Sequence, residues 1–420
     1  MKILLINHRY FLSGGPEKYM FAIKELLEKH GHTVIPFSVA SKKNVKSEYE
    51  HYFAEPIGSD EQVYYEEYKK TPKTVLQMLD RQFYSLGVRK RLEKLIQDTK
   101  PDICYLMHHY NKLSPSVIDA CKKYRIPVVM RLSDFFLACP NALFIRQGQV
   151  CEECLQKSLI SAVKHKCVKN SLVGSLIKVS AMYFHQLLRI YRKVNYIVAP
   201  STFTISKIRQ KLPKNQFVHI PTFINPTEKY NPKLGDYALF VGRTEEEKGI
   251  KTLIKAFQGT KHKLKIVGKS STEYDNKIKA YLSENKLSNI EFIGPKYGEG
   301  LWKIYRKARC VIVPAEWYEN MPNVVLEGML FSKPLIVSNL GSFKDLIKRN
   351  KTGLLFEPKN VEDLRKKIKL VFNNNSLAKK MGKNAYREAI TKYSPEKHYE
   401  TLINIFNTAI AEERAKWKRQ

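Results

Sequence analysis

Acidic residues are scarce in this chain of 420 residues. It has 40 Asp and Glu against 73 Lys and Arg, which leaves a formal net charge of +33 at pH 7. Such an excess indicates a polyanionic partner, whether a nucleic acid, an anionic membrane face or a phosphorylated substrate. Hydrophobic residues still make up 43% of the chain, so a disordered protein is excluded and a folded one is expected.

The sequence also lacks a long uninterrupted apolar run. The best candidate, Ser171–Ile190, is interrupted by Lys178, His185 and Gln186, so we expect no membrane-spanning helix. The apolar run Ile3–Ile6 is too short for the core of a signal peptide, and we therefore expect a cytoplasmic protein. Internal repeats and low-complexity tracts are absent from the sequence as well.

Cysteines are few, and in the cytoplasm they are expected as thiols or metal ligands rather than disulfides. Four of the seven, Cys139, Cys151, Cys154 and Cys167, follow the spacing C-x11-C-x2-C-x12-C. The central C-x2-C lets two thiolates share one tetrahedral ion, which predicts a structural zinc site in a Cys-rich insert at 139–167. Reduced thiols and an iron–sulfur cluster are the alternatives.

Short β-branched runs alternate with helical patterns in both halves of the chain. This alternation predicts an α/β protein with two Rossmann-like, doubly wound parallel sheets that face one cleft. We expect an N-terminal domain at 1–225, a linker at 226–236, a second domain at 237–395, and a helix at 396–420 that packs back toward the first domain. Ligands bind such sheets beyond the carboxyl ends of the strands, so the loops after strands are the places to search.

The loop after the first predicted strand carries Gly14 and Gly15, directly before a helix that opens at Pro16. Two glycines let the backbone approach a ligand, and the start of the helix offers free N–H groups to an anion. An ordinary tight turn between a strand and a helix would have the same sequence.

A second loop leaves the predicted strand Tyr237–Val241 with Gly242 and Arg243, and Lys248 then precedes the next helix. Two cations five residues apart beside a helix N-terminus suit a diphosphate, because lysine supplies a point charge and arginine can bind two oxygens. The three glutamates between them offer an alternative, a salt-bridged surface turn.

A third segment, 314–338, contains Glu319 in a loop and Glu327 on the helix that Pro322 is expected to open. Asn323 and its neighbours would then point free amides toward a ligand. Carboxylates on either side of an anion site suit a ligand with hydroxyls at both ends of a phosphate bridge, since a carboxylate accepts hydrogen bonds from a diol. Two solvated glutamates on an ordinary helix are the alternative.

Taken in order, these motifs resemble those of retaining GT-B glycosyltransferases of family four, a large group that uses nucleotide sugars. The matching features are Gly14-Gly15, Gly242-Arg243…Lys248-Gly249, the pair Glu319/Glu327, and Gly341-Ser342 followed by Thr352-Gly353-Leu354. The resemblance extends over nearly the whole chain. It implies transfer of a hexosyl group from a UDP- or GDP-sugar to a glycan or lipid-linked acceptor in cell-envelope polysaccharide biosynthesis.

The resemblance also implies roles for individual residues. Arg243 and Lys248 would hold the diphosphate and stabilise the charge that grows on it as the sugar leaves. Glu319 would bind sugar hydroxyls and Glu327 the ribose diol. The rest of the donor site would be formed by residues from the same loops: Gly14, Gly15, Gly242, Asn320, Met321, Pro322 and Asn323. Enzymes of this family need no metal or other cofactor for catalysis, and the leaving phosphate helps to deprotonate the acceptor.

One position departs from the family. There a His-Asp pair follows the strand that resembles Pro127–Arg131, whereas this chain has Ser133-Asp134. Serine can donate a hydrogen bond but cannot carry charge near neutral pH. Altered donor geometry, a substitute such as His108 or His109, and lost activity are the explanations. We expect an active enzyme in which Ser133 and Asp134 belong to the catalytic residues.

Basic stretches in the first domain, including Lys164–Lys169, predict peripheral association with an anionic membrane at its inner face, although a solvated basic surface is an alternative. Three rival functions remain: a nucleotide-sugar-binding pseudoenzyme, a GT-B phosphorylase or epimerase, and a nucleic-acid-binding protein. We expect no nucleic-acid partner, since the sequence has no zinc finger, RNA-recognition signature or basic recognition helix.

Overall fold

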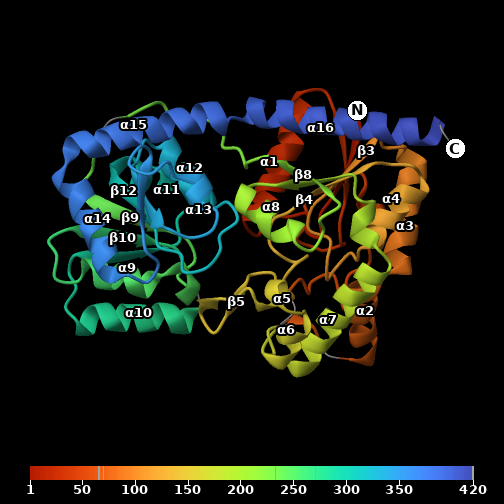
Figure 1. Cartoon of the computed structure of the whole chain (residues 1–420), viewed down its shortest axis with the longest axis horizontal. Helices are drawn as coiled ribbons and strands as arrows, with labels where there is room; N and C mark the ends of the chain where they lie inside the picture. The colour runs from red at the N-terminus through yellow and green to blue at the C-terminus, as the bar shows by residue number, and fades with distance from the viewer. Residues whose placement is uncertain (65–66, 70, 232, 270, 419–420) are drawn as a thin grey trace. The chain divides into compact units, whose positions relative to one another are not determined.

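The computed structural model describes residues 1–64, 67–69, 71–231, 233–269 and 271–418. The chain divides into two compact units, which Figure 1 shows with the colour following the sequence. Unit 1 comprises 1–142, 152–220 and 399–420, and unit 2 comprises 143–151 and 221–398. Pro232 of the predicted linker lies outside the described residues.

Unit 1 is built on a parallel sheet of six strands in the order β2-β1-β3-β4-β7-β8. The strands are β1 Lys2–Ile6, β2 Thr33–Phe37, β3 Ile103–Leu106, β4 Val128–Arg131, β7 Tyr196–Ala199 and β8 Gln216–His219. The α-helices of this unit are α1 Gly15–Lys29, α2 Pro72–Phe83, α3 Leu86–Thr99, α4 Ser116–Lys123, α5 Glu153–Gln156, α6 Ile160–Lys164, α7 Leu172–Leu187, α8 Thr202–Arg209 and most of α16 Pro395–Lys418. The described residues of this unit also include the 3-10 helices η1 Glu50–Tyr52 and η3 Ile190–Lys193.

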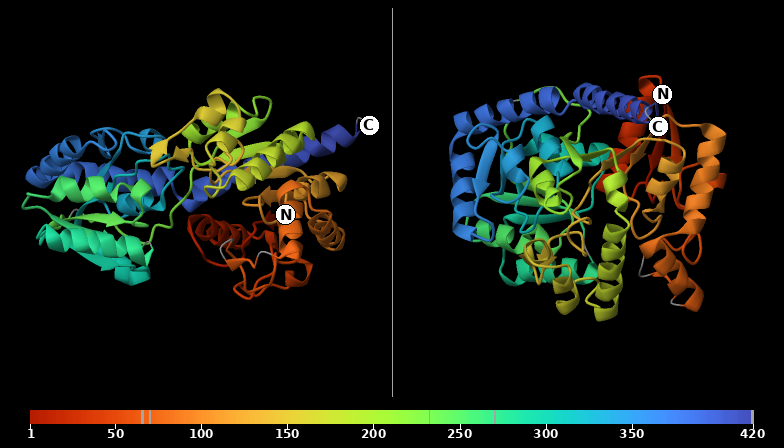
Figure 2. Two further views of the ribbon diagram at one scale, coloured as in Figure 1. Left: turned by 90° about the horizontal axis from the view of Figure 1, so that it is seen from below. Right: turned by 45° about the vertical axis from the view of Figure 1, so that its right-hand side comes forward.

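Unit 2 contains the second parallel sheet, of six strands in the order β11-β10-β9-β12-β13-β14. The strands are β9 Tyr237–Val241, β10 Lys263–Val267, β11 Ile290–Gly294, β12 Ala308–Val313, β13 Leu335–Ser338 and β14 Gly353–Phe356. The helices are α9 Ile250–Phe257, α10 Thr272–Glu284, α11 Gly298–Lys307, α12 Asn323–Leu330, α13 Phe343–Leu346, α14 Val361–Asn373, α15 Asn375–Lys392 and the 3-10 turn η4 Glu246–Lys248. Its main part, 221–398, runs from green to blue in Figures 1 and 2.

The core of unit 2 follows from the alternation of side chains along each strand. Leu239 of β9 belongs to one buried cluster, together with residues of α11, α12 and α15. Its neighbours Ala238 and Phe240 belong to the other cluster, with residues of α9 and α14. Helices therefore cover both faces of the sheet, which explains why its strands are apolar throughout instead of alternating with polar residues.

The predicted strands are present in the structure with small shifts at their ends, and an edge strand and a hairpin were missed. The edge strand is β8, and the hairpin joins β5 Ile145–Arg146 to β6 Gln149–Val150. The sequence placed this hairpin in the first domain, but Leu143 and Ile145 pack against the core of unit 2. The packing of these two apolar side chains therefore places the hairpin in unit 2.

The C-terminal helix α16 lies with unit 1 from Tyr399 onward. The Tyr399 ring stacks on His30 with centroids 3.7 Å apart, and Phe406 packs edge-on against Tyr105 of β3. Further along, Glu413 accepts hydrogen bonds from Lys122 and Asn195. Aromatic packing and a partly buried ion pair thus hold this helix on the unit that begins the chain.

Candidate functional site

The strand order of unit 2 reverses between β9 and β12, so the two loops that follow these strands diverge. Such a switch point is where a doubly wound sheet leaves room for a ligand beyond the strand ends. The loop after β9 begins with Gly242 and Arg243, and the loop after β12 begins at Pro314. Both motifs selected from the sequence therefore lie at the switch point of the same sheet.

Gly249 fixes how the two loops meet. It lies in the left-handed region with φ 74°, and a Cβ added there would stand 1.9 Å from the carbonyl oxygen of Pro314. Only glycine fits this approach. Next to it, the amide of Glu316 donates to the carbonyl of Glu247 over 2.8 Å. The backbone after β9 is thus held against the backbone after β12.

Lys248 and Glu319 form the central contact of the site. The Lys248 Nζ lies 2.5 Å from Glu319 Oε1, and the two side chains are only 18% and 11% exposed. The indole Nε1 of Trp317 donates to the same carboxylate oxygen over 2.9 Å, and Lys248 Nζ lies 4.8 Å from the centroid of the Trp317 ring. Water is largely kept from this ion pair, so its charges act more strongly than they would at the surface.

Arg243 behaves differently. Its guanidinium bonds to Glu245 at 2.6 Å, but the arginine side chain is 57% exposed. The salt-bridged turn considered from the sequence is therefore present for Arg243 and its neighbouring glutamate. Lys248 instead pairs with Glu319, 71 residues further along the chain, which places one cation in a buried contact and leaves the other able to turn toward an anion.

Glu327 lies on α12, which is buried on most sides. Its Oε2 accepts a hydrogen bond of 2.9 Å from the hydroxyl of Tyr305, and burial, reinforced by this carboxylate, raises the pKa of Tyr305 well above its usual value. Pro322 occupies the position before the first residue of α12, Asn323, as the sequence predicted. The start of this helix therefore lies at the same end of the sheet as Glu319.

The neighbours of Glu319 hold the loop in place. Ser342 donates from its hydroxyl to the Glu319 carbonyl over 2.6 Å. The buried Met321 accepts the amide of Thr222 on its sulfur at 3.0 Å. Asn320, between these two residues, is half-buried. These contacts lock the backbone from which the Glu319 carboxylate projects.

Unit 1 has its own switch point, between β1 and β3. Gly14 caps α1 and Gly15 is its first residue, so the glycine pair lies at a helix start as predicted. The buried Glu17 in the first turn accepts a hydrogen bond of 2.8 Å from Ser13. Across the switch point, the amide of His8 donates to the carbonyl of His108 over 2.7 Å.

Asp134 is tied to residues that follow β3. Its Oδ2 contacts His108 Nε2 at 3.2 Å and also accepts from the hydroxyl of Tyr110, while its Oδ1 accepts the amide of Phe136 at 3.0 Å. Burial would raise the pKa of Asp134, but the contact with His108 and the other hydrogen bonds outweigh it and lower that pKa. Ser133, next to it, is half-buried and makes no side-chain hydrogen bond to any described residue.

His108 and His109 were both considered as substitutes for the missing histidine, and the structure separates them. His109 is fully buried and bonded to the Met107 carbonyl and to the Tyr191 hydroxyl. Burial lowers its pKa to about 4. His109 is therefore a structural histidine, whereas His108 pairs with Asp134.

The four cysteines predicted as zinc ligands all lie within the part of the chain that the structure describes. Among the described residues, no group of three or more His, Cys, Asp or Glu side chains could hold a metal ion, and none of the cysteines forms a disulfide. Cys154 and Cys167 pack in a small apolar cluster beside α7, whereas Cys139 donates to Asn141 and Cys151 belongs to unit 2. The zinc site stays a prediction from spacing.

Sequence reasoning missed Trp317, Tyr305 and the pairing of His108 with Asp134. Trp317 stands two residues before Glu319, and an aromatic in a polar loop between a strand and a helix was the available signal. Tyr305 lies on α11, far from Glu327 in sequence, and no pattern linked the two.

Comparisons with known proteins agree with this architecture. A family model described as Glycosyltransferase Family 4 matches residues 13–228, and one described as Glycosyl transferases group 1 matches residues 225–388. An uncharacterized glycosyltransferase of Methanocaldococcus jannaschii, MJ1178, is 31% identical over 201 residues, which cover 48% of this chain and 56% of that protein. The capsular polysaccharide biosynthesis glycosyltransferase CapM of Staphylococcus aureus is 27% identical over 45% of this chain and 51% of its own.

The chain spans about half the length of the curated relatives that it matches. Among solved structures, HepE of Anabaena in complex with UDP and glucose superimposes with a TM-score of 0.63 at 16% identity, over 97% of this chain and 100% of that chain. This likeness identifies the fold as GT-B. Since one family model covers more than half of the residues, the chain belongs to glycosyltransferase family 4.

Proposed function

We propose that this chain is a retaining glycosyltransferase that uses a nucleotide-diphosphate sugar. The observation that carries this function is the pairing of Lys248 with Glu319 at the switch point of unit 2, beside the exposed Arg243. Lys248 and Glu319, which both contact Trp317, can bind a phosphate and a sugar hydroxyl at the same time.

The chemistry follows from these charges. The bond between the sugar C1 and the phosphate oxygen breaks, a bond from C1 to the acceptor oxygen forms on the same face, and the acceptor proton passes to the leaving phosphate. Arg243 and Lys248 stabilise the negative charge that grows on the diphosphate. Because Arg243 and Lys248 supply this positive charge, we propose that catalysis needs no metal ion or other cofactor.

The donor would lie along the loops of unit 2. Glu319 would accept hydrogen bonds from the sugar, and Glu327 from the ribose diol, while the loop of Gly242 and the segment from Asn320 to Asn323 would line the diphosphate. UDP- and GDP-sugars are the proposed donors, and HepE, a structural neighbour, was solved with UDP and glucose. In unit 1, Gly14 and Gly15 would let the backbone approach the donor or the acceptor.

We further propose that Asp134 acts with His108, and that Ser133 supplies at most a hydrogen bond to the sugar. His108 is the histidine that contacts the Asp134 carboxylate, so an imidazole lies beside the position where this chain has Ser133. Lost activity would make the chain a nucleotide-sugar-binding pseudoenzyme, and Ser133 is the observation that keeps this second candidate open.

A glycan or lipid-linked acceptor for cell-envelope polysaccharide is the proposed substrate class, and the relative CapM is named for capsular polysaccharide biosynthesis. A lipid-linked acceptor would bring the protein to the inner face of a membrane as a peripheral protein. None of the described helices has the length and apolar character to cross a bilayer.

A donor panel tests this function. Purified protein is incubated with UDP- and GDP-sugars, with and without a lipid-linked glycan fraction, and release of the nucleoside diphosphate is measured. We expect release with one donor class, a fall of at least about tenfold in Arg243→Gln, and no change in Lys251→Gln, a matched control that removes a cation paired at the surface with Glu246. Tight nucleotide binding without turnover of any donor would favour the pseudoenzyme.

A further inference from the structure

Helix α7 of unit 1 exposes a stripe of apolar side chains, although it also buries Val179, Ala181 and Met182. Its exposed residues run along one stripe and are apolar apart from Ser180 and Gln186: Leu172 53%, Val173 64%, Leu176 53%, Tyr183 40% and Leu187 79% exposed. Its buried residues include the charged Lys178 and the polar His185. A surface helix ordinarily buries the apolar stripe and exposes the charges.

Hydrogen bonds inside unit 1 fix this orientation. Lys178 Nζ donates to Asn111 Oδ1 over 2.7 Å, and burial lowers its pKa to about 8. His185 Nε2 lies 2.7 Å from the carbonyl oxygen of Phe83 at the end of α2. A rotation of α7 that hid the leucines would break both contacts and would leave buried polar groups without partners. The apolar stripe is therefore a stable property of the folded unit.

The surroundings of α7 are strongly basic. The sequence contains no Asp or Glu between Glu153 and Glu228, a stretch that includes the whole helix. Lys164 and Lys166 precede the helix, and Arg189 and Arg192 follow it. No carboxylate of a described residue pairs with any of these four cations, which are all exposed.

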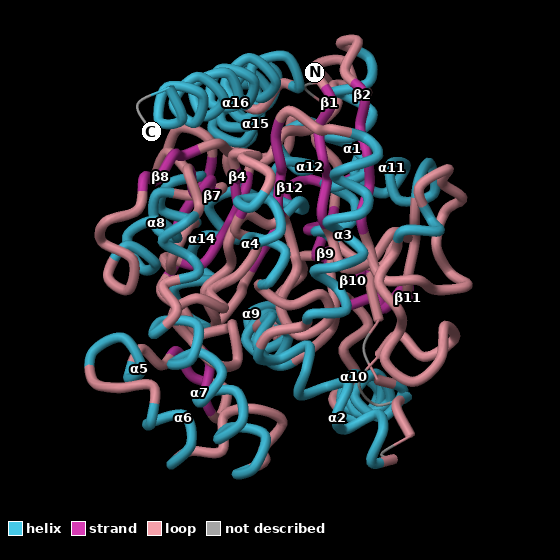
Figure 3. The backbone as a smooth tube through the Cα atoms, turned by 90° about the vertical axis from the view of Figure 1, so that its right-hand side faces the viewer, coloured by secondary structure: helices cyan, strands magenta, loops and turns pink. Residues whose placement is uncertain are grey.

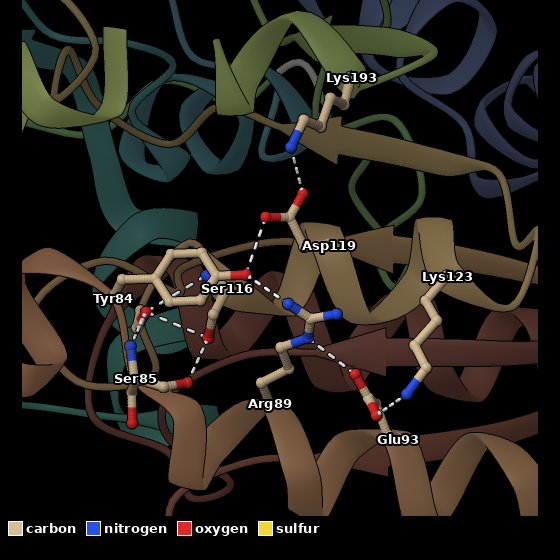
Figure 4. Close-up of polar contacts among 9 residues, drawn as sticks. Tyr84, Ser85, Arg89, Glu93, Ser116, Asp119, Lys123 and Lys193 are labelled. Atoms are coloured by element: carbon tan, nitrogen blue, oxygen red, sulfur yellow. Dashed lines mark hydrogen bonds and ion pairs between the residues drawn. The ribbon is translucent and has the colours of Figure 1, made fainter. Parts of the chain in front are cut away.

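Other cations in this part of unit 1 are paired with carboxylates and are therefore less available to bind an anionic ligand. Lys193, one residue beyond Arg192, is bound to Asp119 at 2.6 Å in the network of α3, α4 and η3 that Figure 4 shows. In the same network Arg89 and Lys123 both contact Glu93. The side chains of that face pair with one another, whereas Lys164, Lys166, Arg189 and Arg192 have no such partner among the described residues.

A basic hollow lies beside the C-terminal half of α7. It has a volume of about 350 Å³, and its lining includes Lys157, Arg189, Arg192 and Lys211 together with Tyr183 and Gln186. Its lining residues include no carboxylate. A hollow of this size and charge fits a phosphate group with its immediate substituents.

We propose that unit 1 docks on an anionic phospholipid surface through α7, with the apolar stripe in the interface and a lipid phosphate in the basic hollow. An apolar face between clusters of Lys and Arg is the arrangement by which helices lie in the plane of an anionic membrane. Helix α6 packs against α7, as Figures 1 and 3 show, and exposes Ile160 at 62%.

A second copy of the chain would also cover an apolar stripe, but it fits the charges less well. A twofold contact through α7 would bring Lys164, Lys166, Arg189 and Arg192 of one copy against the same residues of the other. Like charges brought together in this way cost free energy and favour dissociation. Anionic lipid instead neutralises them.

Docking through α7 deepens the proposed function, because it supplies the surface by which a lipid-linked acceptor would be reached. It is tested without any donor, by sedimentation of the full chain with vesicles of phosphatidylcholine alone and with phosphatidylglycerol added. We expect binding to the anionic vesicles only. We expect Leu176→Ser/Leu187→Ser to lower the partition coefficient at least about tenfold, and Leu370→Ser, an exposed leucine of unit 2, to leave it unchanged.

The charges are tested in the same assay. Loss of Arg189 and Arg192 together, as R189Q/R192Q, should weaken binding roughly twentyfold, whereas Lys193→Gln should change it less than about threefold because that lysine is already paired. Thermal melting and nucleotide binding in each variant show that the fold is intact, since all these side chains are exposed.

Several results would overturn docking through α7: equal binding to neutral and anionic vesicles, an unchanged partition coefficient in L176S/L187S, or a dimer that L176S/L187S abolishes while vesicle binding is absent. Donor turnover is measured separately. Vesicle binding without turnover would reject the proposed function and keep the docking surface, and turnover without vesicle binding would do the reverse.

Discussion

Replacement of Lys248 by methionine tests whether the Lys248–Glu319 ion pair only stabilises the fold or also binds a ligand. The Lys248 and Glu319 side chains are 18% and 11% exposed and 2.5 Å apart, which is neither a surface pair nor a fully buried one. Exposed pairs contribute about 0–1 kcal/mol, and removal of one partner from a buried pair costs about 3–5 kcal/mol. We therefore expect Lys248→Met to lower the free energy of unfolding by about 1–3 kcal/mol.

The cause of that loss can be isolated with the double variant. In Lys248→Met the Glu319 carboxylate keeps only the Trp317 indole as a donor among the side chains described here. Glu319→Gln in the same chain removes the uncompensated charge, so stability should recover by about half or more. Nucleotide affinity should not recover, because the cation for the diphosphate is still missing. We expect it to stay about 10–100-fold below the parent.

Chemical denaturation gives the stabilities and calorimetric titration with UDP and GDP gives the affinities. Lys251→Gln is the matched control: its pair with Glu246 is 67% and 61% exposed, so stability should change by less than about 1 kcal/mol and affinity should stay the same. Parent-like affinity in Lys248→Met, or recovery of affinity together with stability in the double variant, would refute a role for Lys248 in diphosphate binding.

Three further predictions concern single positions. Ser133→Ala should keep the donor turnover of the parent, whereas His108→Asn should lower it at least about tenfold, since His108 carries the contact to Asp134; equal turnover in both variants would contradict this. The pKa of His109 is about 4 in the folded protein against 6.5 for a free side chain, so between these pH values only the unfolded state binds this proton. As the pH falls from 6.5 to 4, the free energy of unfolding should therefore decrease by about 1.4 kcal/mol per pH unit. Denaturation across that range should show a shallower fall in His109→Gln, and an unchanged slope would argue against the assignment. Gly249→Ala should cost about 2–4 kcal/mol of unfolding free energy because of its φ of 74° and its approach to Pro314, against about 1 kcal/mol for Gly259→Ala, where φ is 72° and nothing lies within 4 Å; similar costs at both glycines would show that the approach does not matter.

The sequence predicted the elements of the site better than their pairings. Strand patterns placed β9 and β12 closely, and the rule that ligands bind beyond strand ends selected the loops of Arg243 and Glu319. The partner of Lys248 could not be predicted, because three glutamates nearer in sequence were equally plausible. The packing of Gly249 against Pro314 and the bond from the Glu316 amide to the Glu247 carbonyl bring Glu319 to Lys248.

The orientation of α7 shows a second limit. Periodicity reveals that a helix has an apolar and a polar side, but it does not reveal which side faces the core. Because Lys178 and His185 interrupt the apolar run, the sequence argued against a membrane-spanning helix. In the fold both residues lie on the buried side of α7, because Asn111 and the end of α2 supply hydrogen-bond partners that are distant in sequence.

The most direct test of the account is whether unit 2 prefers a diphosphate. Calorimetric titration of the full chain with a nucleoside diphosphate and its monophosphate, for uridine and guanosine, measures this preference. With Arg243 and Lys248 both engaged, we expect one diphosphate to bind at least about tenfold more tightly than its monophosphate, and Arg243→Gln to remove most of that difference. Equal affinities for the two ligands, or no binding of either diphosphate, would contradict the central claim.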